Sequence, residues 1–205
     1  MEKLKNYTLK VEDREYNFTD EDLSRLFCEH NDYQKQEFVD EKWRLLDIKK
    51  DIKGKSVLDL GCNSGRIGIK CHEAGVKDYT GVDSNWRYLE DCHDQGIKGD
   101  FVRMELNDFA KIWKKKFDVV LCLATFHYII DKEEFIKKMA DISKEMFVLE
   151  GPVENGDPEF APKQELVEAL LNKYFKSVEF CGPSVSPSPK AIHSKRFIWK
   201  CKNNL

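Results

Sequence analysis

Apolar runs and amphipathic stretches alternate along residues 54–205. The short apolar runs predict buried strands at 55–60, 79–83, 101–104, 117–123, 146–150, 178–180 and 196–200. Apolar residues at helical spacing predict helices at 67–73, 86–93, 132–143 and 164–174. Strands that alternate with helices are typical of right-handed βαβ units. We therefore expect an α/β fold built on a doubly wound, seven-stranded, mostly parallel sheet.

The last two predicted strands differ from the others in their connection. A loop over 181–195 joins them, with three prolines and no helical pattern. Neighbouring strands without a crossover helix pair antiparallel. The sheet should therefore end in a C-terminal antiparallel hairpin, which an ordinary dinucleotide-binding fold lacks.

The N-terminal residues follow a looser pattern. Thr19 followed by three acidic residues is typical of a helix start, and apolar positions between 38 and 48 have helical spacing. We expect residues 1–53 to form an N-terminal helical lid region. Residues 54–205 should form the core, with the whole chain making a single domain.

Composition narrows the class of protein. The chain has 205 residues, of which 41% are hydrophobic and 12% aromatic, as expected for one folded domain. The net charge of −3 shows no overall basic field of the kind that nucleic-acid binding favours.

No apolar run reaches membrane-spanning length, so we expect no membrane partner. Seven cysteines without a visible secretory leader predict reduced thiols and a cytoplasmic protein. Cys71-His72 and Cys92-His93 lack partners at metal-binding spacing, so we expect no metal.

A glycine-rich turn follows the first strand of the core. Asp59 lies near the end of that strand, and Gly61 and Gly65 enclose the turn. Glycine lets the backbone approach a ligand closely. The GxxxG spacing matches neither the GxGxxG fingerprint nor the P-loop. The turn therefore favours a ligand without phosphate groups, held against a backbone edge.

Asp83 ends the second predicted strand of the core. A carboxylate at that position can accept hydrogen bonds from both ribose hydroxyls of an adenosine. Because NAD and S-adenosylmethionine (SAM) both contain adenosine, Asp83 alone leaves both cofactors open.

Three stretches together resemble the class I SAM-dependent methyltransferases, which have a Rossmann-like fold. Residues 57–65 resemble the first motif of that family, residues 81–84 the second, and residues 117–122 the strand that faces the methyl group. The resemblance covers about residues 53–150, and the predicted closing hairpin agrees with it. It implies a SAM-dependent methyltransferase that uses SAM as cofactor and forms S-adenosylhomocysteine (SAH).

The resemblance also implies roles for single residues. Asp59 and the backbone of 61–65 would hold the methionine part of SAM, and Asp83 the ribose. Glu105 would meet the adenine amino group and the Leu106 amide its ring, with Asp100 as the rival to Glu105. The cofactor-binding residues expected on these grounds, and from the pocket and lid positions, are Asp59, Gly61, Cys62, Asn63, Gly65, Asp83, Ser84, Glu105, Leu106, Leu123 and Tyr33.

The residues after the methyl-facing strand should line the acceptor pocket. Among them, His127 is the catalytic candidate, as a general base, because the ordinary pKa of histidine lies near neutrality. A packing role is the alternative, and Thr125 and Tyr128 are weaker candidates. Residues 126–128, 148–150 and 184–196 resemble both small-molecule and wobble-uridine tRNA methyltransferases.

Four hypotheses follow from these observations. The leading one is methyl transfer to a small-molecule acceptor at oxygen. The alternatives are a tRNA or other RNA methyltransferase, a non-catalytic SAM-binding subunit, and an NAD-dependent dehydrogenase. The missing GxGxxG pattern and the late hairpin count against the dehydrogenase. Nothing in the sequence names the acceptor.

Overall fold

The main sheet of the protein has seven strands. The computed structural model describes residues 6–11, 14–19, 36–153, 162–184 and 195–203. The strands are β3 (Ser56–Leu60), β4 (Asp78–Asp83), β5 (Asp100–Arg103), β6 (Phe117–Leu123), β7 (Ser143–Val153), β8 (Ser177–Pro183) and β9 (Lys195–Lys202).

The strand order in this sheet is β5-β4-β3-β6-β7-β9-β8. Strands β3 to β7 pair in parallel, whereas β9 runs antiparallel to both β7 and β8. The predicted fold is thereby confirmed, including the C-terminal hairpin. Chain order reverses between β3 and β6, and ligands of open α/β sheets bind at such a switch point.

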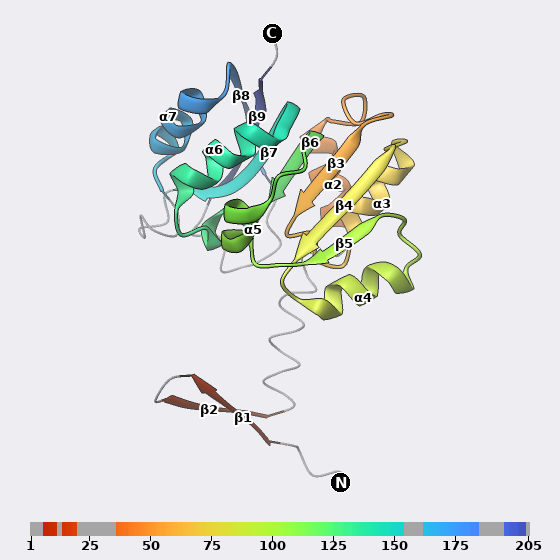
Figure 1. The fold of residues 1–205 in the computed structure, drawn as a ribbon, viewed down its shortest axis with the longest axis vertical. Coiled ribbons are helices and arrows are strands. Elements are labelled where there is room, and N and C mark those ends of the chain that lie inside the picture. Colours follow the sequence, from red (N-terminus) through yellow and green to blue (C-terminus); the bar gives the residue numbers. More distant parts are fainter. Residues whose placement is uncertain (1–5, 12–13, 20–35, 154–161, 185–194, 204–205) are drawn as a thin grey trace.

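Helices cover both faces of the sheet (Figure 1). They are α2 (Gln36–Leu46), α3 (Arg66–Glu73), α4 (Trp86–Asp94), α5 (Leu106–Ile112), α6 (Lys132–Ile142) and α7 (Gln164–Tyr174). The four helices predicted after residue 54 are confirmed. Helix α5 was not predicted, because it is short and buries only Leu106 and Phe109, which is too little for a periodic pattern.

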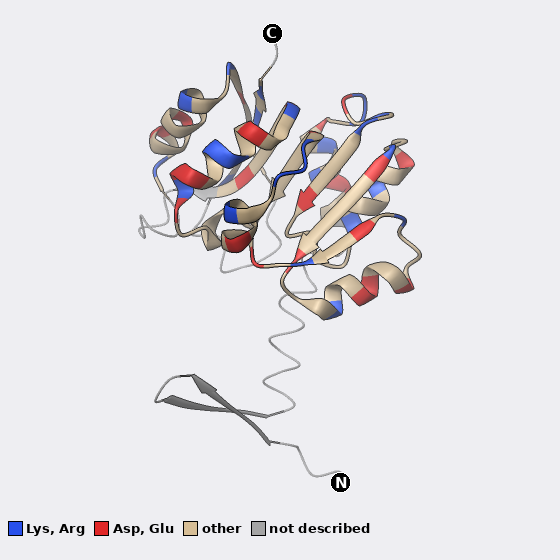
Figure 2. Cartoon of the chain, in the orientation of Figure 1, with Lys and Arg blue, Asp and Glu red and all other residues tan. Residues whose placement is uncertain are grey.

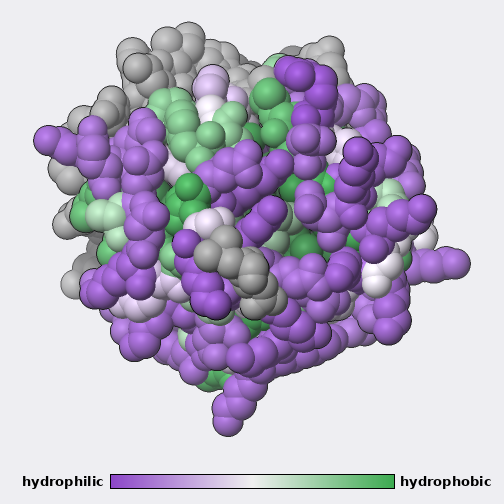
Figure 3. Space-filling model, turned by 90° about the horizontal axis from the view of Figure 1, so that it is seen from above, coloured by the Kyte–Doolittle hydropathy of each residue, from purple (hydrophilic) through white to green (hydrophobic). Residues whose placement is uncertain are grey.

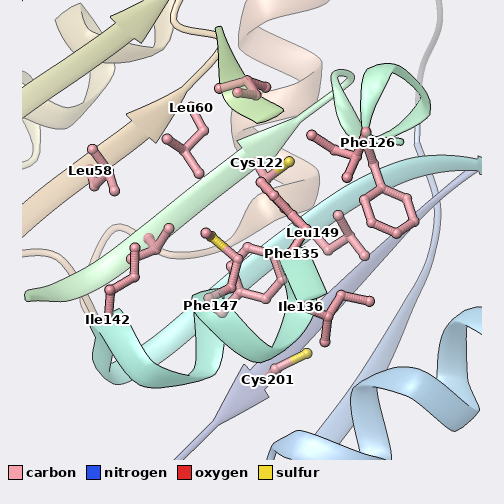
Figure 4. Close-up of a cluster of buried hydrophobic side chains, with 14 of the residues drawn as sticks. Leu58, Leu60, Cys122, Phe126, Phe135, Ile136, Ile142, Phe147, Leu149 and Cys201 are labelled. Carbon is pink, nitrogen blue, oxygen red and sulfur yellow. The ribbon is translucent and has the colours of Figure 1, made fainter. Parts of the chain in front are cut away.

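Two apolar clusters lie on opposite faces of the sheet. One joins strand residues such as Leu58 and Leu149 to α5, α6 and α7, with Phe135 of α6 packed against the strands (Figure 4). The other joins Val57 and its neighbours to α2 and α3. Each fully buried side chain of this size contributes about 1.5–3 kcal/mol. This double packing holds the strand ends in fixed positions.

The N-terminal residues contain strands as well as a helix. Strands β1 (Asn6–Val11) and β2 (Arg14–Thr19) form a separate antiparallel sheet, so the prediction of helices is wrong there. Strands form here because apolar and polar residues alternate, with Tyr7, Leu9 and Val11 separated by polar residues. The helix start predicted at 20–22 and Tyr33 lie outside the described residues.

Helix α2 and the residues after it belong to the packing of the core. Leu46, Ile48 and Ile52 are fully buried in the same cluster as Val57. The last part of the predicted lid region therefore packs against one face of the sheet. A lid function for residues 1–53 stays a prediction.

Charged side chains lie mainly on the helices and loops, while the strand bodies are largely uncharged (Figure 2). The face of the molecule seen in Figure 3 is mostly hydrophilic, with apolar side chains in scattered patches. None of the described helices is both long and apolar enough to cross a membrane. Within the described ranges, no group of three or more His, Cys, Asp and Glu is placed to hold a metal ion.

Candidate functional site

The glycine turn after β3 is fixed against the end of β4. The amides of Gly61 and Cys62 both donate to the Val82 carbonyl, at 2.7 and 3.1 Å. Gly61, Asn63 and Gly65 have positive φ angles of 77°, 48° and 76°, the region that glycine enters without strain. A Cβ on Gly61 would lie 2.2 Å from Cγ2 of Thr125. The turn therefore has a defined shape that a side chain at Gly61 would disrupt.

Asp83 joins the end of β4 to this turn. Its Oδ2 accepts a hydrogen bond from the Asn63 amide at 3.0 Å, and its Oδ1 accepts one from the Asn85 amide at 2.9 Å. Partial burial raises the pKa of Asp83, and the negative charge of Glu105 adds to the rise. Each carboxylate oxygen can still accept a second hydrogen bond. The carboxylate is thus held in place and can receive two hydroxyl donors.

Glu105 and Leu106 lie where β5 passes into α5. Glu105 is exposed at the start of the helix and close enough to Asp83 to affect its pKa, and Leu106 is buried. Asp100 lies at the opposite end of β5, since Asp100 pairs with Thr80 while Asp83 pairs with Arg103. The register therefore brings Glu105, and not Asp100, to the edge of the sheet that carries Asp83. Ser84 is exposed at the same edge.

Asp59 lies in the interior. It is 2% exposed and accepts a hydrogen bond from the hydroxyl of Tyr79 at 2.8 Å. Burial raises the pKa of Asp59 to about 6; the nearby charge of Asp83 adds to the rise and that of Lys42 opposes it. The carboxylate therefore holds the buried Tyr79 hydroxyl in place within the core. A direct contact of Asp59 with the methionine part of SAM stays a prediction.

Two cysteines fill the space beneath the turn. The Cys62 thiol is hydrogen-bonded to that of Cys92, which together with burial raises the pKa of Cys62. The Cys92 thiol also donates to the carbonyl of Asn63 at 3.4 Å. A Cβ on Gly81 would lie 2.8 Å from the Cys62 sulfur. Gly81 is thus needed for packing under the turn, a role that sequence reasoning missed.

The segment after β6 forms the next wall of the site. Leu123 is 7% exposed, and the Thr125 hydroxyl donates to the Leu60 carbonyl at 3.2 Å, which ties this segment to β3. His127 follows in the short 3-10 helix η2 (Phe126–Tyr128) and is half-buried. Burial, and then the charges of Arg196 and Lys132, lower the pKa of His127 to about 4. The imidazole is therefore neutral near pH 7.

Four further polar residues lie at this end of the sheet: Glu150 and Arg196, whose charges affect the pKa of His127, and Lys42 and Ser184, which contact Glu150. Lys42 donates to Glu150 at 2.7 Å, and the Ser184 hydroxyl donates to Glu150 at 2.9 Å. Arg196 lies at the same end of the sheet, where it pairs with Pro152 of β7. We call Lys42, His127, Glu150, Ser184 and Arg196 the acceptor-side cluster. Glu150 and Arg196 are charged residues within strands, which was the signal that could have identified them.

The sequence of the described core matches the family called methyltransferase domain over residues 57–146. These residues span β3 to the start of β7, and with them the glycine turn, Asp83 and the end of β6. Over these residues the chain matches a methyltransferase domain, which agrees with the resemblance of its motifs to the class I SAM-dependent methyltransferases. The resemblance of this domain to SAM-dependent methyltransferases implies SAM as its cofactor. The hydrogen-bonding capacity left on Asp83 fits the ribose of an adenosine, while contacts of Leu106 and Leu123 with the cofactor stay predictions.

Curated relatives of the methyltransferase domain include enzymes with different acceptors. The tRNA U34 carboxymethyltransferase of Campylobacter hominis is 28% identical over 115 residues, covering 50% of this chain and 39% of that protein. Its counterpart in Helicobacter acinonychis is 24% identical over 147 residues, covering 65% and 55%. The ubiquinone biosynthesis O-methyltransferase of Escherichia coli is 26% identical over 95 residues, covering 44% and 39%. The chain thus spans about half the length of these relatives, or less.

Solved structures share the fold at lower sequence identity. The magnesium protoporphyrin IX methyltransferase of Synechocystis with bound SAM has a TM-score of 0.64 and 18% identity, covering 88% of this chain and 83% of that one. A SAM-dependent methyltransferase of Mesorhizobium loti has a TM-score of 0.65 and 14% identity, covering 80% and 99%. These similarities establish the fold.

Proposed function

We propose that this protein transfers the methyl group of SAM to an oxygen atom of a small-molecule acceptor. When bound, SAM supplies an electrophilic methyl group on a sulfonium, so the protein's work is to bind, orient and exclude water. In this proposal the glycine turn, Asp83, Glu105 and Leu106 hold the donor. The acceptor lies beyond Leu123, facing the acceptor-side cluster with His127 in contact with it.

The enclosed acceptor-side cluster is the observation that carries this proposal. Glu150 is fully buried, Arg196 is 7% exposed and the Lys42 side chain is 12% exposed. Lys42 and Ser184 already satisfy Glu150, so the cluster is a fixed polar group below the surface. A recessed set of polar groups suits a small molecule that enters the protein better than a large one that binds across its surface.

Part of the positive charge on the described surface is neutralised by acidic partners. Nucleic-acid binding depends on basic residues that neutralise phosphates. Several lysines here are paired with acids, among them Lys55–Glu145, Lys70–Asp40, Lys111–Asp108, Lys116–Asp141, Lys137–Glu134 and Lys173–Glu133. This pairing supports a small-molecule acceptor over RNA.

A tRNA acceptor is the second candidate, and the similarity to tRNA U34 carboxymethyltransferases favours it. Incubating the protein with methyl-labelled SAM and, separately, a small-molecule cell extract or total tRNA distinguishes the two. We expect label in the small-molecule fraction. Label in the tRNA fraction alone would support the second candidate. No transfer to either pool, with SAH still bound in calorimetry, would favour a non-catalytic SAM-binding subunit.

A further inference from the structure

The segment after β6 (residues 124–128) begins in a backbone conformation that few residues adopt. Ala124 has a φ of 60°, in the left-handed region that residues other than glycine rarely enter. Its amide donates to the Glu150 carbonyl of β7 at 3.1 Å. Such conformations persist only where surrounding contacts hold them, and they gather at functional sites. The contacts that hold this segment therefore bear on its role.

Thr125 fastens the beginning of the segment to the donor side. Its hydroxyl donates its only proton to the Leu60 carbonyl at 3.2 Å, and it lies 3.3 Å from Sγ of Cys122, from which it can accept. Its methyl group, Cγ2, fills the space that a Cβ on Gly61 would need. Thr125 thus contacts both the last residue of β3 and the first residue of the glycine turn.

Asn107 fastens the other end of the segment. Its side-chain nitrogen donates to the Tyr128 carbonyl at 3.1 Å, and its side-chain oxygen accepts from the Ile130 amide at 3.0 Å. Asn107 lies in the first turn of α5, directly after Leu106. In the proposed function the glycine turn and Leu106 both hold the donor. Each end of the segment is therefore joined to a donor-holding element.

The separation between the segment and the donor turn matters for the transfer step. In the proposed function the donor lies on the glycine turn and the acceptor faces the segment. The gap between them then sets the distance from the methyl carbon to the acceptor oxygen. A displacement of about 1 Å at the reacting atoms can slow a reaction about 100-fold. Residues that fix this gap affect the rate without touching either reactant.

We propose that Thr125 and Asn107 are positioning residues for methyl transfer. They hold the segment after β6 at a fixed place relative to the donor. Their loss slows the transfer step more than it weakens donor binding. This inference rests on the proposed function and applies whichever small molecule is the acceptor.

Two substitutions at Thr125 separate its hydrogen bond from its shape. Thr125→Val keeps the shape but loses the bond to Leu60, whereas Thr125→Ser keeps that bond. With saturating methyl-labelled SAM and a small-molecule cell extract, Thr125→Val should transfer label about 10- to 100-fold more slowly than the wild type, and Thr125→Ser within about 3-fold of it. SAH affinity, measured by calorimetry, should stay within about 3-fold in both variants. A proportional loss of transfer and SAH binding in Thr125→Val would overturn the positioning role, and so would a wild-type rate.

Thr80→Val is the matched control. Thr80 is 2% exposed in β4, where it pairs with Leu58, two residues before the Leu60 carbonyl that Thr125 contacts. The substitution removes a buried hydroxyl from the same sheet but leaves the segment after β6 in place. Thr80→Val should transfer label as the wild type does. An equal slowing in Thr80→Val and Thr125→Val would count against a specific role for Thr125.

NMR tests the position of the segment without turnover. His127 lies within the segment, so its ring signals report a displacement in the full-length protein with SAH bound. We expect these signals to shift in Asn107→Leu, which has a similar size but loses both bonds. They should not shift in Asn172→Leu, which loses a side-chain bond within α7.

The outcomes for Asn107 decide the question even if Thr125→Val does not fold. Unchanged His127 signals and an unchanged transfer rate in Asn107→Leu would overturn the inference alone. A wild-type protein that binds no SAH and transfers no label to any pool would instead overturn the proposed function.

Discussion

The donor side and the acceptor side of this site are held together in different ways. On the donor side, the backbone amides of neighbouring residues make the main hydrogen bonds. Gly61 donates to the Val82 carbonyl and Asn63 to the Asp83 carboxylate. On the acceptor side, side chains from separate elements meet. Lys42 and Glu150, for example, are 108 residues apart in the chain. The first arrangement leaves a short motif in the sequence, and the second leaves none.

The donor side belongs to the segment that matches the family, whereas most of the acceptor side lies outside that segment. The matched family segment, residues 57–146, contains the donor side. Of the acceptor-side cluster it contains only His127, since the other members lie outside that segment. Changes to the two sides should therefore have separable effects on donor binding and on stability.

Substitution of Gly61 by alanine should have the largest effect. The new Cβ would lie 2.2 Å from Thr125 at a φ of 77°, which combines overpacking with left-handed strain of together about 2–5 kcal/mol. SAH binding, measured by calorimetry, should be lost. Gly54→Ala is the matched control, because Gly54 has a φ of 72° with nothing within 4 Å of an added Cβ. Equal losses of SAH binding in both variants would contradict a shape requirement at the turn.

Lys42→Met should mainly reduce stability. It leaves the buried Glu150 carboxylate without its 2.7 Å partner, a change that costs about 3–5 kcal/mol. Urea unfolding measures the loss, and adding Glu150→Gln should restore much of it, since the uncompensated charge is then gone. Lys144→Met, which breaks a half-exposed pair with Asp118, should change the free energy of unfolding by about 1 kcal/mol or less. A similar loss in both lysine variants would argue against a special role for the cluster.

Asp83→Asn should weaken donor binding with a smaller change in stability. The amide keeps the shape but loses a charged acceptor for ribose hydroxyls, which should weaken SAH binding by about 10- to 100-fold. Asp78→Asn, at the exposed amino end of the same strand, is the control and should bind SAH normally. Undiminished SAH binding by Asp83→Asn would remove Asp83 from the donor side.

The titration of His127 should show the smallest change near neutrality. Its pKa of about 4 lies below the ordinary 6.5, so its ring signals should stay constant from pH 8 to about 5 in an NMR titration. Because the unfolded chain takes up the proton first, the contribution of His127 to the free energy of unfolding falls as the pH drops from about 6.5 to about 4. His127→Gln should remove that part of the pH dependence. A ring titration centred near 6.5 would show that burial and the nearby positive charges do not lower the pKa of His127.

Much of the fold was predictable because its signals are local. The apolar run at 117–123 is too continuous for an exposed strand, and the structure buries nearly all of it as β6. The proline-containing loop before β9 predicted the antiparallel hairpin correctly. The sequence did not predict strands β1 and β2, because the acidic residues after Thr19 are typical of a helix start and obscure the alternation before it.

The candidate site was only half predictable, for the same reason. The sequence alone predicted the shape of the donor side, because a tight turn needs glycine at specific positions and Asp83 follows directly from the end of a strand. Only the tertiary structure placed β9 between β7 and β8, and with it Arg196 near His127. Only burial lowered the pKa of His127, since desolvation depends on every element packed around the ring. The contacts of His127 and its burial arise only when distant segments pack together on folding. No short stretch of sequence encodes them.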